Sequence, residues 1–445
     1  MTVASQTAPP GWSIIEVPRR WLARAPAPVF ALYAGLMAFG AYFAMYAFRK
    51  PFTVASFADA APVLVQYKIA LVIAQVFGYA LSKVAGIKFI SETPPHRRAV
   101  GILLLIGIAE VALVLFAIVP APLNILCMFA NGLALGMIWG LVFGFLEGRR
   151  TSELLGAMLC ASFILSSGVV KSAGESVMLH GLANEYWMPA VTGLLFVPLL
   201  LICVFGLAVL PPPSAEDEKQ RVARAPMDGA ARHSMFAAFA PGLIALVVIY
   251  VGLTALRDFR DNFAVEIWNG LGFKDDAAIF TYSEVPVAII VLVTLALVMF
   301  IRDNRLAFLA NLFLVALGLA ISGLCSLAFQ HHLIGPVGWM IALGAGLYLA
   351  YTPFNALLFD RFIAASGRSG TAGFLIYVAD ACGYMSSVAL LVFRNFVGVK
   401  ISWVDFLIAI SYSSAAVGLV LILAAGIYFR WRLVRVNPND PTVAH

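Results

Sequence analysis

The sequence contains little charge and few cysteines for its length. Asp, Glu, Lys and Arg make up only 12% of the 445 residues, whereas hydrophobic residues make up 62%. A soluble globular domain carries about twice that share of charged residues, so this composition excludes one. The five cysteines lie inside apolar runs without paired spacing, which indicates small apolar residues and not a disulfide framework or a metal site.

Motifs for catalysis are also missing. The chain has no Walker A sequence, which argues against an ATPase of its own. It has no His-Glu-x-x-His or His-x-x-Glu-His pair and no Gly-x-Ser-x-Gly nucleophile elbow. The six histidines are scattered without ligand spacing. We therefore expect no enzymatic activity, no metal, no cofactor and no binding of nucleic acid.

Long apolar runs dominate what is present. Runs of about 20 residues, long enough to cross a bilayer as helices, recur along the whole chain. They are continuous and do not alternate with polar residues, which excludes a transmembrane barrel. The sequence predicts an all-α polytopic membrane protein in contact with lipid, with twelve spans at 27–49, 68–89, 99–119, 121–146, 154–178, 188–211, 239–261, 277–301, 306–330, 334–360, 371–395 and 403–430.

Basic residues are concentrated in alternate loops, which sets the expected orientation. Cytoplasmic loops of membrane proteins carry an excess of Lys and Arg. The opposite set of loops holds only Lys274, Arg394 and Lys400, apart from Lys50 and Lys68 at helix ends. We therefore expect a multi-pass protein of a bacterial inner (plasma) membrane with both termini in the cytoplasm, which requires an even number of spans.

The longest polar connection, residues 212–236, follows the sixth span and divides the chain into two halves. The predicted organisation is an N-terminal interfacial segment at 1–26, one six-helix bundle at 27–211, the linker, a second bundle at 237–430 and a tail at 431–445. The alternative for residues 1–26 is a disordered tail. In transporters built from such repeats the substrate binds between the halves near the middle of the membrane.

The first span ends with a charge that is costly in a membrane. A guanidinium at membrane depth costs roughly 2.5–3.5 kcal/mol on insertion scales, and Arg49 has no acidic residue nearby in the sequence. We predict that Arg49 points into a central cavity and receives an anion.

The seventh span carries a matching arginine, Arg257, late in the helix. Two equivalent helices that each supply an arginine would clamp an anion from both sides. The alternative is an ion pair within the membrane, in which Arg257 or Arg260 bonds Asp258, Asp261 or Glu284 and holds helices together. For Arg260 a gating or ion-pair role is the preferred interpretation.

Other polar and aromatic residues inside the spans are further candidates, because polar groups at depth face the bundle interior. Lys83 could instead extend to the headgroups, Glu110 could carry a coupling proton or pair with a lysine, and the aromatic residues could simply pack. Beside the two arginines, the predicted substrate-binding residues are Tyr42, Tyr46, Lys83, Trp139, Lys171, Tyr282 and Asn355, and the predicted coupling or gating residues are Glu110, Arg260, Asp261, Glu284 and Asp380.

The fourth span has glycine at every fourth position from Gly132 to Gly148. Small residues at this spacing share one helix face and let another helix approach closely. We predict tight helix packing there; a sliding contact during transport is the functional interpretation of the same pattern.

Several short motifs occur in one order across most of the chain. They are Tyr46-Ala-Phe-Arg49-Lys50-Pro-Phe52, Gly78-Tyr79-Ala-Leu-Ser82-Lys83, Gly136-Met137-Ile138-Trp139-Gly140, Leu256-Arg257, Tyr282-Ser-Glu284, and Gly370-Thr371-Ala372-Gly373-Phe374 followed by Gly383-Tyr384. As an ordered set they resemble the organophosphate:phosphate antiporters of the major facilitator superfamily. The resemblance implies two pseudo-symmetric six-helix bundles, a monomer, and phosphate bound by arginines at Arg49 and Arg257.

The chain departs from that family in three places. The Asp-Arg-x-x-x-Arg/Lys loop after the second helix is replaced by residues 89–98, and the fifth helix has Leu165 about where the antiporters carry a histidine. Asp258 and Asp261 beside the span-seven arginines are foreign to the family's pattern. The resemblance is therefore that of a divergent branch of the family.

The function expected from the sequence is secondary transport of a small anion, phosphate or an organophosphate, by rocker-switch exchange. One alternative is a proton-coupled transporter of carboxylates or sugar acids. An alternative of another class is a sensor or assembly factor that keeps a transporter scaffold without transporting.

Overall fold

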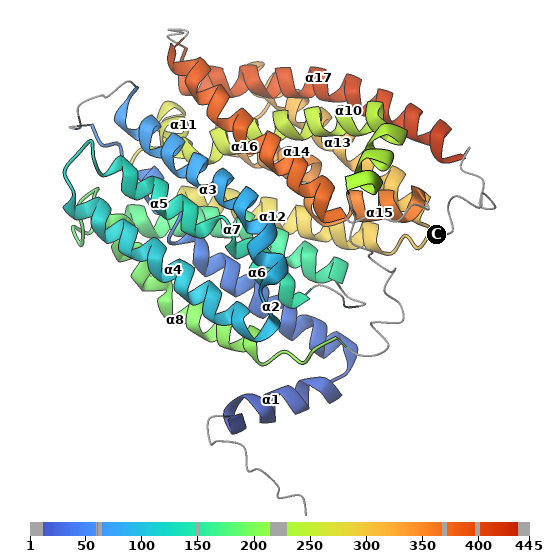
Figure 1. The fold of residues 1–445 in the computed structure, drawn as a ribbon. Coiled ribbons are helices and arrows are strands. Elements are labelled where there is room, and N and C mark those ends of the chain that lie inside the picture. The colour runs from blue at the N-terminus through green and yellow to red at the C-terminus, as the bar shows by residue number, and fades with distance from the viewer. Residues whose placement is uncertain are drawn as a thin grey trace, which may run out of the picture.

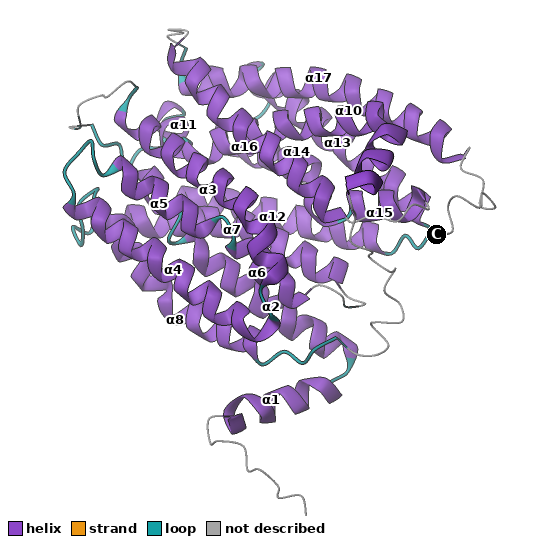
Figure 2. Cartoon of the chain, in the orientation of Figure 1, coloured by secondary structure: helices purple, strands orange, loops and turns teal. Residues whose placement is uncertain are grey.

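The computed structural model describes residues 12–58, 60, 65–146, 149, 152–213, 229–366, 372–396 and 401–434. Every secondary-structure element in these ranges is a helix (Figure 2). Several predicted features lie outside the described residues: 1–11 of the N-terminal segment, 214–228 of the linker, the tail from 435 onward, and Gly370 and Thr371 of the sixth motif.

Eleven helical segments of the described residues are long and apolar enough to cross a membrane. The helices that contain them are α2 (Ala27–Tyr46), α3 (Tyr67–Glu92), α4 (Pro95–Ile118), α5 (Ile125–Leu135) continued by α6 (Ile138–Leu146), α7 (Ser152–Leu179), α8 (Met188–Ala208), α10 (Gly229–Asn262), α12 (Ala278–Met299), α13 (Asn304–Gln330), α14 (Pro336–Ala356) and α17 (Trp403–Val434).

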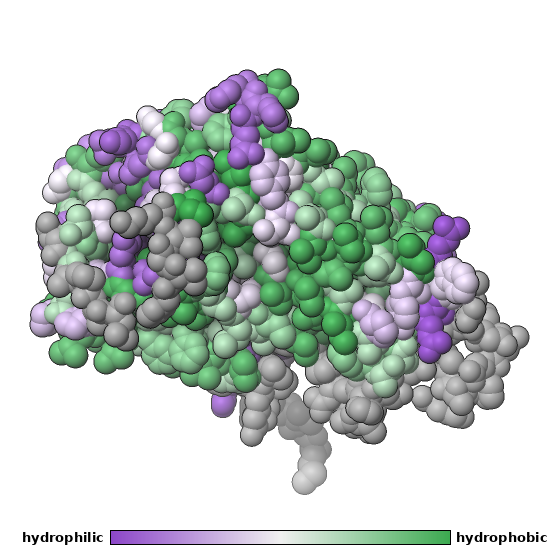
Figure 3. Space-filling model, turned by 90° about the horizontal axis from the view of Figure 1, so that it is seen from above, coloured by the Kyte–Doolittle hydropathy of each residue, from purple (hydrophilic) through white to green (hydrophobic). Residues whose placement is uncertain are grey.

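The exterior of the molecule is apolar where a bilayer would touch it. Large hydrophobic side chains are exposed on many helices, among them Leu104, Leu194, Ile289, Leu324 and Val420. In the space-filling view hydrophobic residues cover the middle of the face, and hydrophilic residues gather toward its left and right sides (Figure 3). Lipid is the solvent that covers such a surface, so the prediction of an integral multi-pass all-α protein is confirmed.

The predicted span at 371–395 corresponds to α16 (Ala372–Phe396), a helix that is not among the eleven. The helix is long enough to cross a bilayer, but its described part includes Asp380 and Arg394. Both charges lower its mean hydropathy. The helix packs against α3 of the first half and α10 of the second.

Two predicted boundaries differ from the structure in ways that matter for the site. The first span was predicted to reach residue 49, but α2 ends at Tyr46 and is followed by a turn and a short 3₁₀ helix, η1 (Pro51–Val54). Pro51 has no backbone N–H to donate to the carbonyl of Ala47, and its ring would clash with that carbonyl, so the α-helix cannot continue through Pro51. The predicted span 334–360 ends at Ala356, and a separate helix, α15 (Leu358–Ser366), follows.

The two halves lie side by side with their helices running in one general direction (Figure 1). The helices up to α8 form the lower part of the view and those from α10 onward the upper part. The halves meet chiefly through α3 with α16 and α7 with α12, and α7 also contacts α14. At Gly168 of α7 an added Cβ would lie 2.5 Å from the carbonyl oxygen of Phe280, so α7 and α12 touch at backbone distance.

The glycines of the fourth span do pack tightly. A Cβ at Gly132 would lie 2.1 Å from the carbonyl oxygen of Gln75, and one at Gly136 would lie 2.5 Å from the Ser82 Cβ. Both contacts are with α3, so only glycine permits this approach. The packing prediction is confirmed at these two positions, and the sliding interpretation stays a prediction.

The N-terminal segment contains α1 (Trp12–Arg24), which lies apart from the bundle (Figure 1). Trp21 and Val17 are exposed, whereas Leu22 is buried and Arg19 donates to the carbonyl oxygen of Ala208 at 3.0 Å. A helix is therefore present in this segment, and its location at a membrane surface stays a prediction.

Candidate functional site

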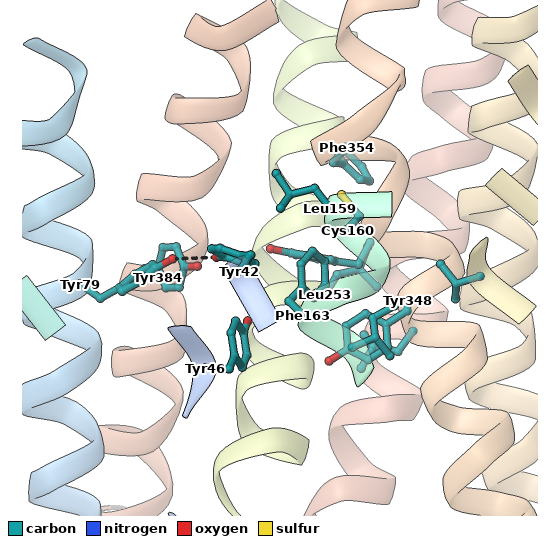
Figure 4. Packing of buried hydrophobic residues seen from close by; sticks show 14 of the residues in the cluster. Tyr42, Tyr46, Tyr79, Leu159, Cys160, Phe163, Leu253, Tyr348, Phe354 and Tyr384 are labelled. Atoms are coloured by element: carbon teal, nitrogen blue, oxygen red, sulfur yellow. Dashed lines mark hydrogen bonds between the residues drawn. The ribbon is translucent and has the colours of Figure 1, made fainter. Parts of the chain in front are cut away.

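Two tyrosines from opposite halves meet at the centre of the molecule. The rings of Tyr79 on α3 and Tyr384 on α16 have centroids 5.1 Å apart. The hydroxyl of Tyr42 on α2 lies 3.4 Å from the Tyr79 hydroxyl (Figure 4), and the Tyr46 ring packs against Tyr42. We call Tyr79 and Tyr384 the tyrosine pair.

Three cations surround the tyrosine pair. The Arg49 guanidinium lies 3.9 Å from the Tyr79 ring centroid. The Lys83 ammonium lies 5.7 Å from the ring centroid of Tyr79 and 6.0 Å from that of Tyr384. The Arg257 guanidinium lies 5.7 Å from the ring centroid of Tyr384. Cations favour the faces of aromatic rings. The structure therefore brings Arg49, Arg257 and Lys83 together around the tyrosine pair.

Lys83 does not extend toward the headgroups but crosses to the other half. Its ammonium lies 2.8 Å from a carboxylate oxygen of Asp380, whose other oxygen accepts from the Tyr250 hydroxyl. Tyr250 also lies 3.3 Å from the amide nitrogen of Asn355. The Trp139 ring centroid is 5.3 Å from the Lys83 ammonium. The predicted residues Lys83, Asp380, Asn355 and Trp139 thus lie in one network, and Tyr250 links Asp380 to Asn355.

Arg257 carries its own counter-ion. Its Nε and Nη2 lie 3.0 and 2.7 Å from one carboxylate oxygen of Asp258, and the second oxygen accepts from Ser387 at 2.7 Å. The guanidinium also stacks 4.4 Å from the Tyr351 ring centroid. The ion-pair alternative for this residue is therefore realised in the structure, next to the tyrosine pair.

Arg49 has no such partner. Its side chain is only 5% exposed, and it bonds no carboxylate of the described residues. Its Nε is buried without a hydrogen-bond acceptor in the same part of the chain. The backbone is fixed instead: Gln75 donates to the Arg49 carbonyl at 2.9 Å, and Asn131 donates to that of Phe48 at 3.0 Å. The Arg49 guanidinium thus lacks a carboxylate partner among the described residues, while the backbone around it is held in place.

A second group of charges, the outer layer, lies further along the same helices. Asp261 accepts from Lys50, Lys171 and Ser167, which joins the two halves. Two further pairs belong to it: Arg260 with Glu284 at 2.7 Å and Lys68 with Glu266 at 2.5 Å. A cavity beside Lys171, Arg260 and Glu284 measures about 10 Å³, room for about one water molecule.

Two predicted site residues lie away from these groups. Tyr282 on α12 is 70% exposed, on the exterior of the molecule. Glu110 on α4 lies against Gly193 of α8, where an added Cβ would be 2.6 Å from a carboxylate oxygen and 2.9 Å from the Phe48 ring. Both Glu110 oxygens are buried without a hydrogen-bond partner among the described residues, so the predicted lysine pair is not found.

Sequence reasoning overlooked most of the aromatic lining. Tyr79, Tyr384 and Tyr351 were not among the candidates. A signal was available, because residues four apart in sequence share a helix face. Each of these tyrosines stands four positions from a polar candidate, in the pairs Tyr79 and Lys83, Asp380 and Tyr384, and Tyr351 and Asn355.

Comparison with known proteins gives one match. Residues 51–432 match a family described as a family of unknown function, DUF5690. The matched stretch includes Lys83, Arg257, Asp258 and Asp380, and it begins just after Arg49. No curated protein matches the chain. The matched region covers most of the sequence, and the chain therefore belongs to the DUF5690 family.

Proposed function

We propose that the protein is a secondary transporter of the major facilitator type that moves a small anion by alternating access. In this proposal α16 also crosses the membrane, as the eleventh of twelve spans, and residues 27–211 and 237–430 are two six-helix bundles that rock against each other. The arrangement supports it in one respect: the bundles contact each other through α3 with α16 and α7 with α12, and the tyrosine pair lies in the first of these contacts.

The observation that carries the proposal is the unpaired charge of Arg49. Six other cations lie at or near the contact between the halves, and each bonds a carboxylate: Lys50, Lys68, Lys83, Lys171, Arg257 and Arg260. An uncompensated charge in a low-dielectric interior is strongly unfavourable. Binding of an anion beside the tyrosine hydroxyls would compensate the charge of Arg49 and remove this unfavourable energy.

Arg49 is the principal ligand in this proposal. Its fork of N–H donors matches the oxygens of a phosphate or carboxylate, a geometry that lysine does not reproduce. The resemblance described above favours phosphate or an organophosphate. Binding neutralises the charge between the halves, which favours closure around the loaded site over closure around the empty one.

Glu110 favours a second candidate, a proton-coupled carrier of carboxylates. Its carboxyl group lies beside Gly193, as does the ring of Phe48, the residue before Arg49, and both of its oxygens lack hydrogen-bond partners in the described part of the chain. A carboxyl group so placed can exchange a proton without breaking an ion pair. Transport that depends on a pH gradient in the wild type, and loses this dependence in Glu110→Gln, would support this candidate.

A thermal-shift screen of the purified protein against phosphate esters, carboxylates and sugars tests the proposal. A ligand that binds only the folded state raises the unfolding temperature by mass action. We expect anions to stabilise the wild type and Arg305→Gln, which removes an exposed arginine far from the tyrosine pair, but not Arg49→Gln. If no compound stabilises the wild type, or Arg49→Gln responds equally, the proposal fails and a non-transporting scaffold becomes the better account.

A further inference from the structure

The charges around the tyrosine pair come from both halves and can be counted. The cations are Arg49, Lys83 and Arg257, and the carboxylates bonded to them are Asp380 and Asp258. With three positive and two negative groups, this layer carries one uncompensated positive charge, on Arg49.

The two carboxylates are held in place and are not free to swing away. Asp258 accepts from Arg257 through one oxygen and from Ser387 through the other. Asp380 accepts from Lys83 through one oxygen and from Tyr250 through the other. Both carboxylates are thus bonded on both oxygens, so an entering anion meets Lys83 and Arg257 already neutralised.

Every cation of the outer layer bonds a carboxylate, but Lys50 and Lys171 share Asp261, so four cations face three carboxylates there. Lys50 bonds Asp261 and the side-chain oxygen of Asn262, and Lys171 bonds both a carboxylate oxygen and the backbone oxygen of Asp261. Arg260 bonds Glu284 and the Met340 carbonyl. The cavity there has room for about one water molecule only.

We propose that the site takes an anion with a single negative charge, such as a phosphodiester or a monocarboxylate, in preference to a dianion. The inference rests on the proposed anion transport and narrows its substrate class. Within the layer of the tyrosine pair, one negative charge balances Arg49, whereas a second would add to the negative charge of the two bonded carboxylates, Asp258 and Asp380, without a cation of its own.

Neutral groups remain for the rest of such a ligand. The hydroxyls of Tyr46 and Tyr384 form no hydrogen bond with any described residue, although both rings are buried. A tyrosine hydroxyl can donate to or accept from a ligand oxygen without changing the charge balance. Specificity beyond charge therefore comes from hydroxyl groups here.

The test compares ligands that differ by one charge. Dimethyl phosphate carries one negative charge, and methyl phosphate carries two at about pH 8, well above its second ionisation near pH 6. Lactate and malate form a second such pair. Thermal shifts are measured for the purified full chain as each compound is titrated.

In the wild type, we expect dimethyl phosphate and lactate to raise the unfolding temperature at concentrations at least about tenfold lower than those needed of methyl phosphate and malate. Asp258→Asn and Asp380→Asn raise the charge of the layer by one through separate ion pairs, so each should move the preference toward the dianions. The double variant Arg257→Gln/Asp258→Asn leaves the charge unchanged and should keep the preference for monoanions, even if it binds all four compounds more weakly.

The outcomes separate this inference from the proposed function. A wild type that prefers methyl phosphate and malate overturns the single-charge inference and leaves anion transport standing. A preference that moves in neither aspartate variant also overturns it. If none of the four compounds stabilises the wild type or either aspartate variant, the anion site itself is refuted. Should one aspartate variant fail to fold, the other and the wild type still decide.

Discussion

The two halves of the molecule present an arginine to the same tyrosine pair in opposite electrostatic states. Arg49 stacks 3.9 Å from the Tyr79 ring centroid and bonds no carboxylate in the described ranges. Arg257 stacks on Tyr351 and holds Asp258 at 2.7 Å. The two arginines therefore differ in their surroundings: Arg49 bonds no carboxylate of the described residues, whereas Arg257 is balanced by Asp258.

Local structure explains part of this difference. Helix α2 ends at Tyr46, and Pro51 follows closely, so Arg49 lies in a turn whose backbone is held by Gln75 and Asn131. Helix α10 instead continues to Asn262, which keeps Arg257 within the helix beside the adjacent Asp258. The asymmetry suggests a substrate that is bound chiefly by the first half.

The largest effect should come from Arg49→Gln. We expect anion transport in reconstituted vesicles to fall about 100-fold or more, because two charge-assisted hydrogen bonds of about 1.5 kcal/mol each are lost. Arg49→Lys should also be strongly impaired, since lysine lacks the paired donors. The unfolding temperature should stay equal or rise, because the change removes an uncompensated charge. A marked loss of stability in Arg49→Gln would show that Arg49 has a structural role after all.

Arg257→Gln should instead destabilise the fold. The substitution leaves Asp258 buried without its counter-ion, which costs about 3–5 kcal/mol when a buried pair is broken. The double variant Arg257→Gln/Asp258→Asn should recover most of this loss. Chemical unfolding in detergent measures both. If Arg257→Gln and Arg49→Gln were equally stable, the claim that only Arg257 is balanced by a buried counter-ion would be wrong.

The Lys83–Asp380 pair joins the halves and should show direct coupling. A double-mutant cycle of Lys83→Gln and Asp380→Asn should give an interaction energy of about 0.5–3 kcal/mol, the range for residues in contact. Because the pair spans α3 and α16, either single change should also increase labelling of a cysteine placed between the halves. An additive cycle would mean that the pair contributes nothing to holding the halves together.

The smallest effect is expected at Lys68 and Glu266. The side chain of Glu266 is 20% exposed, so water and salt weaken this pair. Replacing both residues with glutamine should change stability by about 1 kcal/mol or less. The difference from the wild type should shrink further at high salt. A loss of stability as large as that of Arg257→Gln would show that water and salt do not weaken the pair of Lys68 and Glu266.

The sequence predicts most of the fold because lipid imposes a simple rule. Continuous apolar runs must form helices that satisfy their own backbone groups, and the predicted spans match helices throughout. Boundaries set by local geometry are harder to predict. The stop of α2 at Tyr46 and the break between α5 and α6 at Gly136 and Met137 are followed directly by further apolar residues, so hydropathy alone does not mark them.

The charged residues of the site were easier to predict than their partners. Arg49, Arg257, Lys83 and Asp380 stand out because charges are rare in apolar runs. Which carboxylate meets which cation depends on how α3 and α16 face each other across the halves, and no local pattern encodes that contact. Tyrosine does not stand out in a membrane helix, so the tyrosine pair was visible only through its four-residue spacing.

The most direct measurement of the central claim is phosphate exchange by Arg49→Gln. Vesicles that contain the purified protein are preloaded with phosphate at a mildly acidic pH, where the ion is mainly singly charged, and uptake of labelled phosphate is followed. The account predicts exchange by the wild type and by the exposed-arginine control Arg305→Gln, and no exchange by Arg49→Gln. Exchange by Arg49→Gln at the wild-type rate would contradict it.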